Sequence, residues 1–522
     1  MLHSAWKPAR RLALGLVLVA APAFANFDGT LDASLDPPLG ADPFYGIPGL
    51  FDYEADLGGG SPYTNNDYAA ATAVQVDGKI VVAGFSWNTY LGVDQNACVL
   101  ARFNADGSLD SGFGGGRIVI NFSPSAGEND CYLDAIALQG DGKIVVAGNL
   151  TDATHGERGI VFRYNANGTR DAAFDNGVSG QAGYVVAGDN SAFSSVTLAS
   201  DGSIITAGHG IQGGHTDEDF FYEAWAGDNG DAEYWNWAAF NLGADDDDRA
   251  YAVVLERNVC IGLPCFVHDE LYLVGSANNA AYGDGLTNHD CAIAAYYKGL
   301  TDSQFSVDTS FNGSGLETID FPVAPANEGD NICRAAASRP GYGLVIGGEN
   351  YFISTLGGGT PGLASNYALA EVDVEGNVTR QDAFAYFQDL AYPGIFNGIF
   401  GIAHEPNGKL VVNGYAGSSD ANRQPSDAGV IRFNADFSRD STFGNDGDGL
   451  AILSLDGLGG LLAHQREWAT ALALDDRGHI VVTGERSVIY GVDNDYDWLV
   501  GRLDTSDEIF RDSYDGIVPP VQ

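Results

Sequence analysis

The stretch 141–148 reads Asp-Gly-Lys-Ile-Val-Val-Ala-Gly, and worn copies of it recur along the whole chain. The same eight residues stand at 77–84, and variants of them stand at 407–414 and 477–484. An Asp-Gly pair is typical of a tight hairpin turn in which both central residues take positive φ values. The β-branched run after it predicts a strand that is buried on both faces. The closing glycine predicts that the chain leaves the sheet there, at a crowded point.

Alignment on this stretch gives seven copies, whose turns are 60 to 73 residues apart. The turns fall near Gly78, Gly142, Gly202, Glu270, Gly343, Gly408 and Gly478. Each copy has room for four strands; in the first copy we expect them at 71–76, 80–84, 99–103 and 117–122, with a loop of about a dozen residues between the second and the third. Four antiparallel strands repeated seven times predict an all-β fold, a seven-bladed β-propeller.

The copies also share the segment that comes after the hairpin. In the first copy this is Leu-Ala-Arg-Phe-Asn-Ala-Asp-Gly-Ser-Leu-Asp at 100–110 and Phe-Gly at 113–114. The phrase resembles the repeat of the bacterial delta-60 family, strongly in copies one, two, six and seven and weakly in copies three to five. The resemblance implies a β-propeller of kelch- or NHL-like blades in an exported protein. It carries no common catalytic motif, so it implies no activity.

The first 25 residues have the pattern of a secretory signal peptide. Lys7, Arg10 and Arg11 precede a short apolar run, which ends at the small-x-small site 23–25. An uncleaved anchor is the alternative, but the run is shorter than the roughly 20 residues that span a bilayer. We therefore expect one propeller domain over 26–522, exported to the periplasm or the extracellular space, with no membrane span.

Charge narrows the range of partners. The chain has 70 Asp and Glu against 25 Lys and Arg, a formal net charge of −45. Such an excess repels nucleic acid and anionic membranes, so we expect neither as a partner. It is typical of a soluble exported protein, and it is compatible with cation binding.

Several recurrent residues are expected to be structural. An arginine stands one residue before the end of the third strand in four copies, at Arg102, Arg163, Arg432 and Arg502. An aspartate follows in the next turn, at Asp110, Asp171 and Asp440. A guanidinium fork can bind such a carboxylate and fix the turn. Aromatic wedges between blades are expected at Phe113, Phe174, Phe311, Phe443 and Tyr514.

A second recurrent aspartate provides the candidate metal site. The position six residues before the end of the third strand holds Asp219, Asp290, Asp427 and Asp497 in copies three, four, six and seven. These carboxylates can cap loop amides, or they can join loop carbonyls in holding Ca²⁺, which takes six to eight oxygen ligands. The acidic runs 245–248 and 445–449 are further calcium candidates, although neither has the spacing of an EF-hand loop.

Two functions remain open. The sequence has no Gly-x-Ser-x-Gly and no His-Glu-x-x-His motif. One hypothesis is a non-catalytic binding propeller with an acidic loop face and a glycan or protein ligand. The alternative is a polysaccharide-active hydrolase or lyase that uses carboxylates at the channel mouth. The aromatic third copy, with Trp225, Trp235 and Trp237, suits sugar stacking under both hypotheses.

The last expectations concern covalent and topological closure. Six cysteines in an exported chain predict disulfides. Repeat register pairs Cys98 with Cys131 and Cys291 with Cys333, each joining a blade to the loop that enters the next, and leaves Cys260 to pair with Cys265. The seventh copy lacks a good fourth strand, so we expect the segment 26–60 to close the ring, with 50–53 pairing near 499–503.

Overall fold

The computed structural model describes residues 29–37, 44–55, 66–91, 93–122, 128–175, 182–213, 216–240, 247–261, 266–278, 289–321, 330–339, 342–354, 362–384, 397–417, 426–444, 447–455, 466–490 and 493–505. Every helix or strand element in these residues is a β-strand, so none of them is a helix that could span a membrane. The expected signal peptide and Cys265 lie outside the described residues, as does the side chain of Cys260.

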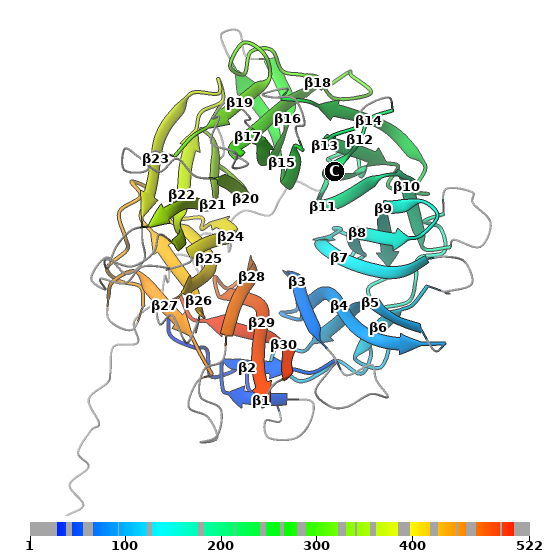
Figure 1. Cartoon of the computed structure of the whole chain (residues 1–522), viewed down its shortest axis with the longest axis vertical. Helices are drawn as coiled ribbons and strands as arrows, with labels where there is room; N and C mark the ends of the chain where they lie inside the picture. The colour runs from blue at the N-terminus through cyan, green and yellow to red at the C-terminus, as the bar shows by residue number, and fades with distance from the viewer. Residues whose placement is uncertain are drawn as a thin grey trace, which may run out of the picture.

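Seven antiparallel sheets are arranged in a ring, which confirms the seven-bladed propeller (Figure 1). The innermost strands are β3 (Asp67–Val74), β7 (Glu128–Leu138), β11 (Ser191–Leu198), β15 (Arg249–Ile261), β20 (Asn331–Arg339), β24 (Asn397–His404) and β28 (Arg466–Leu474). The second strands are β4 (Ile80–Tyr90), β8 (Ile144–Asp152), β12 (Ile204–Ile211), β16 (Phe266–Asn278), β21 (Gly343–Ser354), β25 (Leu410–Gly417) and β29 (Ile480–Tyr490).

The third strands are β5 (Val93–Phe103), β9 (Gly156–Tyr164), β13 (Glu218–Trp225), β17 (His289–Gly299), β22 (Gly362–Val372), β26 (Ser426–Phe433) and β30 (Asp493–Leu503). The outer strands are β6 (Arg117–Ile120), β10 (Tyr184–Asp189), β14 (Ala232–Ala238), β18 (Ser306–Val307), β19 (Leu316–Ile319), β23 (Val378–Phe384) and β27 (Leu450–Leu453). Blade seven takes its outer strands β2 (Leu50–Tyr53) and β1 (Phe44–Ile47) from the N-terminal part of the chain. Blades four and seven therefore have five strands each, one more than expected.

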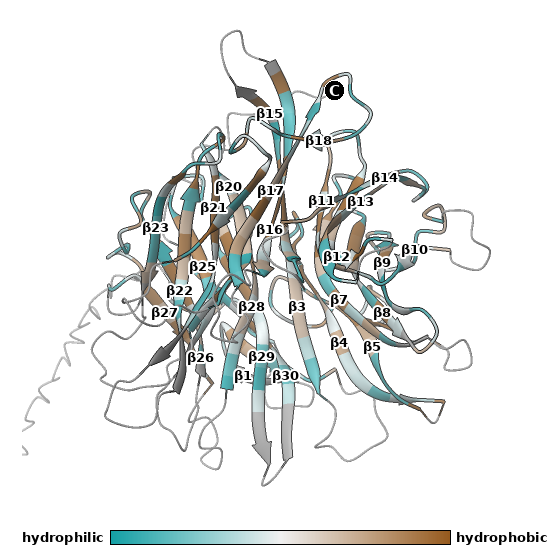
Figure 2. Ribbon diagram, turned by 45° about the horizontal axis from the view of Figure 1, so that its top comes forward, coloured by the Kyte–Doolittle hydropathy of each residue, from teal (hydrophilic) through white to brown (hydrophobic). Residues whose placement is uncertain are grey.

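The blades pack through apolar side chains on both faces of their middle strands. In β17 the seven residues from Asp290 to Tyr296 are all buried, and the strand is brown along much of its length in Figure 2. Hydrophobic clusters join neighbouring sheets; one of them unites residues of β12 and β13 with residues of β16 and β17. Burial on both faces explains why these strands read as β-branched and alanine-rich runs without alternation.

Two details of the hairpins differ from the expectation. The second and third strands of blade one extend to Tyr90 and from Val93, so a long hairpin replaces the loop expected between them. In blade four, Glu270 lies inside β16 and not at a turn, because β15 and β16 continue pairing as far as Ile261 and Phe266. Strand pairing satisfies the backbone of these segments, which a loop would leave to water.

The repeated Asp-Gly turn also differs from the expectation, because only its glycine has a positive φ value. Gly78 has φ +81° and Gly142 has φ +85°, but the preceding aspartates are not among the residues with positive φ. The carboxylate of Asp77 instead accepts a hydrogen bond from the backbone amide of Lys79 at 3.2 Å, and Asp141 accepts one from the amide of Lys143 at 3.1 Å. The turn thus needs a left-handed conformation at glycine, and an aspartate cap before it.

The glycine that closes each repeat does not end its strand. Gly84, Gly148 and Gly484 lie within β4, β8 and β29, where a Cβ atom would stand 1.7 to 2.0 Å from a carbonyl oxygen of the innermost strand. That carbonyl is brought close by a β-bulge in the innermost strand of the same blade. The glycine is therefore required by the bulge opposite it, and not by an exit from the sheet.

The N-terminal segment closes the ring as expected. Leu50 pairs with Gly501 and Tyr53 with Trp498, so β2 lies beside β30 at the bottom of Figure 1. Asp32 takes the place of the missing turn aspartate of blade seven, because Arg502 Nε donates to its carboxylate at 2.6 Å. Leu35 takes the place of the wedge and packs against Gly107 of blade one, whereas Tyr514, the expected wedge, lies outside the described residues.

The arginine forks bind the expected aspartates, and those of Arg102, Arg163 and Arg502 also reach the next blade. Arg163 Nε donates to Asp171 at 2.9 Å, and its Nη2 donates to the carbonyl of Asp228 in blade three at 3.0 Å. Its guanidinium lies 4.6 Å from the ring centre of Phe174, and that ring packs against Gly230 of blade three. The fork and the wedge thus act together as the contact between consecutive blades.

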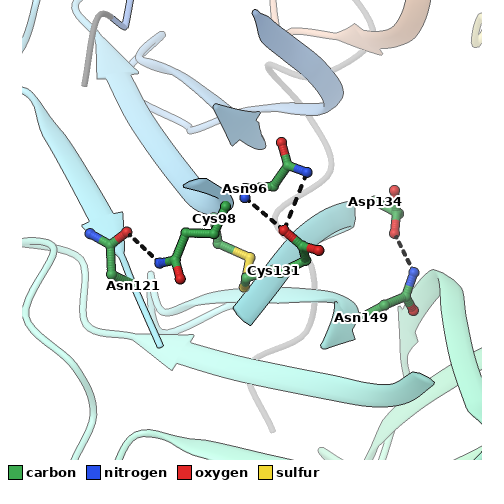
Figure 3. The surroundings of a disulfide bond; sticks show 8 residues. Asn96, Cys98, Asn121, Cys131, Asp134 and Asn149 are labelled. Carbon is green, nitrogen blue, oxygen red and sulfur yellow. Dashed lines mark hydrogen bonds between the residues drawn. A yellow bond between two sulfur atoms is a disulfide. The ribbon is translucent and has the colours of Figure 1, made fainter. Parts of the chain in front are cut away.

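Two of the three expected disulfides lie in the described residues and are confirmed. Cys98 bonds to Cys131 with a Cα separation of 5.0 Å, and Cys291 bonds to Cys333 with 5.1 Å. Figure 3 shows the first of them joining the third strand of blade one to β7. Cys131 and Cys333 lie in innermost strands, so each bond joins two strands and not a strand and a loop.

Candidate binding belt around the ring axis

Every innermost strand has a β-bulge at the same level, and one residue per blade is left out of the pairing there. These seven bulge residues are Ala70, Asp134, Ser194, Tyr251, Arg334, Phe400 and Thr470. A bulge turns a side chain away from the position that regular pairing would give it. The residues that follow the repeat glycine stand at the same level on the second strands: Phe85, Asn149, His209, Ser276, Glu349, Tyr415 and Glu485. We call these fourteen residues the bulge belt.

The belt is most polar and most aromatic between blades four and six. Arg334 Nε lies 2.8 Å from Glu349 Oε2, and the Tyr415 hydroxyl donates to Glu349 Oε1 at 2.8 Å. The Arg334 guanidinium also lies 5.2 Å from the ring centre of Tyr251 and 5.5 Å from that of Phe400. Glu349 is only 1% exposed. One cation and one carboxylate of blade five are thus fixed between three aromatic rings, one from blade four and two from blade six.

Between blades six and one, a carboxyl group lies among aromatic rings. Burial raises the pKa of Glu485 to about 8. Its Oε2 atom has no hydrogen-bond partner among the described residues. It faces Trp468 across the strand pair, and the Trp468 and Tyr415 ring centres are 5.9 Å apart. Burial and the charge of Glu485 raise the pKa of Tyr68 to about 12. Burial therefore favours the protonated form of Glu485 at neutral pH.

Blades two and three carry a second group of ionisable side chains. Burial and the neighbouring Glu157 raise the pKa of Asp134 to about 7, and Asn149 Nδ2 donates to its Oδ2 at 3.2 Å (Figure 3). His209 Nε2 lies 3.8 Å from Glu218 and 3.9 Å from Glu157. Burial lowers the pKa of His209, so the imidazole is neutral at pH 7. This part of the belt holds carboxyl groups with raised proton affinity beside a neutral base.

The four aspartates of the sequence prediction stand on four separate blades. They lie in the first half of the third strands β13, β17, β26 and β30. Asp219 is 1% exposed and Asp290 is 7% exposed. In the described part of the chain, no three metal-ligating side chains that include one of them bring their ligand atoms within 4.8 Å of one another. The structure therefore places them at equivalent positions without gathering them.

The acidic runs are partly described and bind backbone amides. Residues 245–246 and 445–446 lie outside the described residues. Asp248 accepts the amide of Phe240 at 3.0 Å and that of Asn278 at 3.1 Å. Asp448 accepts the amide of Leu450 at 3.0 Å. These carboxylates serve as caps of loops and strand ends.

Two of the three tryptophans of the aromatic third copy belong to the packing of the blade. Trp225 is 1% exposed and donates its indole N–H to Thr206 at 3.0 Å, so it belongs to the core of the blade. Trp237 packs on Phe221 with 4.4 Å between ring centres. Trp235 alone of the three tryptophans is exposed, at 59%. Tyr234 and Trp237 of the outer strand β14 thus pack against Tyr222 and Phe221 of β13, whereas Trp235 is exposed.

The belt itself was missed by sequence reasoning, although half of its signal is readable. The residue after the repeat glycine can be read from the sequence in every clear copy, as Phe85, Asn149, Tyr415 and Glu485. The bulge residues cannot be read in this way, because a β-bulge has no sequence signature in the innermost strand. The one sequence signal is the glycine on the neighbouring strand, where a Cβ atom would clash with the bulged backbone.

Comparisons with known proteins support the repeat and the fold. The family described as "Domain of unknown function (DUF5122) beta-propeller" matches residues 75–113, 139–174 and 405–443, which are repeats of blades one, two and six. These matches support a β-propeller repeat family. No curated protein sequence matches this chain significantly.

Similar solved structures are remote. An α-L-arabinofuranosidase from Fusarium graminearum is 8% identical with a TM-score of 0.39, over 72% of this chain and 95% of that one. The β-propeller domain of the trilobed protease from Pyrococcus furiosus is 7% identical with a TM-score of 0.35, over 83% and 95%. The extracellular domains 1–2 of Drosophila semaphorin 1a are 9% identical with a TM-score of 0.38, over 86% and 88%.

Proposed function

We propose that this chain is an exported, non-catalytic β-propeller that binds a glycan against the bulge belt. The observation that carries the proposal is the set of aromatic rings set beside fixed polar groups between blades four and seven, with Tyr251, Phe400, Tyr415 and Trp468 only partly buried. Aromatic faces bind the apolar faces of sugar rings, and a few fixed polar groups give such a site its orientation. A protein ligand is the other possible occupant.

The state of the carboxyl groups argues for binding and not for catalysis. Hydrolysis of a glycosidic bond needs an acid and a free carboxylate about 5 to 10 Å apart. Glu349 is held by Arg334 and by the Tyr415 hydroxyl, so it is not free to attack or to activate water. Burial raises the pKa of Glu485 to about 8, which favours its protonated form at neutral pH, and the pKa of Asp134 to about 7, which leaves it about half protonated there.

Those same raised pKa values keep a hydrolase as the second candidate. A carboxyl group with a pKa of about 7 or 8 is suited to general acid catalysis at neutral pH. If the protein turns over a polysaccharide, we expect Glu485→Gln or Asp134→Asn to abolish turnover. Turnover in the wild type that survives both substitutions would remove these residues from the hydrolase hypothesis.

A glycan array combined with an activity screen on polysaccharides tests the proposal. The comparison is between the wild type, Trp468→Ala and the control Trp235→Ala, whose side chain is exposed on β14 away from the belt. We expect the wild type and Trp235→Ala to bind the same glycans without turnover. We expect Trp468→Ala to lose roughly tenfold or more in affinity, about 1.4 kcal/mol. Absence of binding by the wild type, or equal binding by Trp468→Ala, would contradict the proposal.

We also infer export and a delta-60 type of repeat. Export is supported by the leader-like sequence 1–25 together with two disulfides, which persist in oxidising compartments. Sequencing the N-terminus of the protein from the periplasm and from the medium tests this. We expect a chain that begins at residue 26, and its location separates periplasmic from secreted protein. A chain that keeps its first residue in the cytoplasm would contradict the inference.

A further inference from the structure

One corner of the blade repeats with the same chemistry in blades one, two and six. There the lysine after the Asp-Gly turn faces the turn aspartate that the arginine fork binds. Lys79 Nζ lies 3.1 Å from Asp110 Oδ2, the oxygen that also accepts Arg102 Nε at 2.8 Å. The corresponding lysine–aspartate distances are 3.5 Å for Lys143 and Asp171 and 3.0 Å for Lys409 and Asp440. A cation thus occupies this corner in three blades.

Blade seven changes this corner at three positions. His479 stands where Lys79, Lys143 and Lys409 stand in the other blades. Asp504 stands in place of Asn104, Asn165 and Asn434, directly after the third strand. Asp475 stands in place of Gln75, Gln139 and Glu405. The corner therefore loses its lysine and holds three carboxylates, including Asp32 of the closing segment.

The imidazole of His479 is oriented as a metal ligand would be. Its Nδ1 lies 2.6 Å from Asp475 Oδ2, and the carboxylate therefore holds the proton on that nitrogen. Its Nε2 points to the other two carboxylates, 3.9 Å from Asp32 Oδ2 and 3.6 Å from Asp504 Oδ1. Asp32, His479 and Asp504 are, in the described part of the chain, the one group of three or more metal-ligating residues whose ligand atoms lie within 4.8 Å of one another.

We propose that Asp32, His479 and Asp504 bind a divalent transition metal ion, for which Zn²⁺ is the probe. Ligand atoms about 2.0 to 2.1 Å from a tetrahedral zinc ion are about 3.4 Å apart, close to the 3.6 and 3.9 Å that separate His479 Nε2 from the two carboxylate oxygens. A histidine nitrogen with two carboxylates suits zinc better than Ca²⁺ or Mg²⁺, which take oxygen ligands. The ion takes the position of the lysine of the other blades, which likewise shares its aspartate oxygen with the arginine fork; here Asp32 Oδ2 also accepts from Arg502 Nε at 2.6 Å. It neutralises the additional carboxylates.

The proposed ion would tie together the two ends of the ring. Asp32 belongs to the N-terminal closing segment, whereas His479 and Asp504 belong to blade seven. Hydrogen bonds already join these parts, since the amide of Asp504 donates to the Thr30 carbonyl at 2.8 Å and that of Gly29 to the Asp504 carbonyl at 2.6 Å. The side chains of His479 and Asp504 are 20% and 39% exposed, so an ion and its water ligands can enter. The corner lies at the turn between β28 and β29 and is separate from the bulge belt.

The test uses His479→Lys, which restores the residue that three other blades use, and Asp504→Asn, which restores their asparagine. Chelator-treated full-length chains are titrated with Zn²⁺ at pH 8, and bound zinc per chain is measured together with the melting temperature. We expect the wild type to bind one more Zn²⁺ than His479→Lys. We expect Asp504→Asn to bind it roughly tenfold more weakly or worse. His155→Lys, in a turn of another blade, is the control and should bind as the wild type does.

Stability gives an independent readout. The wild-type melting temperature should rise with Zn²⁺ and fall in chelator, because the ion binds the closed ring and not the unfolded chain. The melting temperature of His479→Lys should be the same in Zn²⁺ and in chelator, because the lysine supplies the positive charge without a metal ion. Equal zinc uptake by the wild type and His479→Lys, or a wild-type melting temperature indifferent to zinc, would overturn the proposal. Neither result depends on whether the bulge belt binds a glycan.

Discussion

Arg163 shows how much one side chain does in this repeat. Its guanidinium binds Asp171, a carbonyl of the next blade and the face of Phe174, and it is 1% exposed. We expect Arg163→Lys to lower the free energy of unfolding by about 2 kcal/mol or more, because an ammonium group keeps the charge but cannot replace the fork. Chemical denaturation measures the change. Arg477→Lys, in an exposed turn, is the control, and equal losses in the two variants would contradict the special role of the fork.

Glu485 should make the stability of the ring depend on pH. Burial raises its pKa from 4.5 to about 8 in the folded chain. A group with a raised folded pKa stabilises the fold fully below its unfolded pKa, and this contribution is lost as the pH rises through the folded value. We expect Glu485→Gln to gain about 2 to 4 kcal/mol relative to the wild type between pH 5 and pH 9. Glu233→Gln, exposed on β14, should show no such gain. A stability difference between Glu485→Gln and the wild type that stays constant from pH 5 to pH 9 would show that Glu485 does not change its protonation state in that range.

At the residue scale, the sequence predicted which side chains pair within a blade but not the contacts that these side chains make with the next blade. The eight-residue spacing of Arg163 and Asp171 recurs in other copies, and this recurrence was enough to predict the fork. The contact of Arg163 with Asp228 could not be predicted, since it depends on the angle between neighbouring blades. The pKa of Glu485 depends on burial among rings from other parts of the chain, which one sequence cannot give.

The bulge and its glycine form the characteristic element of each blade. In blade two, a Cβ atom on Gly148 would stand 2.0 Å from the Tyr132 carbonyl oxygen. The backbone or the bulge would have to shift, so we expect Gly148→Ala to destabilise the chain by about 1 to 3 kcal/mol. Gly140 of the same blade has nothing within 4 Å of its Cβ position, so Gly140→Ala is the matched control. Similar melting temperatures for the two variants would refute the steric argument.

The starts of the third strands are the place to test calcium. We propose that Asp219, Asp290, Asp427 and Asp497 lower their mutual repulsion by binding Ca²⁺, which would stabilise the native state. The melting temperature should then be higher in millimolar Ca²⁺ than in chelator at constant ionic strength, and Asp427→Asn should reduce the difference. His479→Lys is the background to use, because it removes the proposed zinc site. Identical curves would reduce the four aspartates to caps of loop amides.

Element lengths were the least predictable feature at this scale. The expected strand 80–84 is the buried half of β4, and the strand continues to Tyr90 through residues that alternate in burial. The polar content of that second half suggested a loop, since exposed hairpins and loops share a composition. In blade four, alignment on the repeat placed the turn at Glu270, whereas β15 and β16 pair as far as Ile261 and Phe266.

At the scale of the whole molecule, the number of blades and their closure followed from counting. Seven copies of one phrase required seven sheets, and a seventh copy without a fourth strand required a donor. The segment around Asp32 has the turn of a repeat without its preceding strands, which identified the donor. The bulge belt is a property of the assembled ring, because its groups meet only when blades four to seven stand side by side. That is why the candidate site could not be named from the sequence.

Ring closure by the N-terminal segment gives the last prediction. β2 pairs with β30, Phe51 and Tyr53 pack on Phe103 of blade one, and Arg486 forms a buried ion pair with Asp52. Removal of the residues before 61 would expose the edge of blade seven and the ring of Trp498, which is 0% exposed in the closed ring. We expect a sharply lower melting temperature and a red-shifted tryptophan emission, because an unpaired edge strand and an open ring lose this packing together.

A peptide of residues 29–55 added in trans should restore both signals by pairing with β30, whereas the same peptide with Asp32→Asn and Asp52→Asn should restore them poorly. An unchanged melting temperature after truncation would show that the ring closes without the segment.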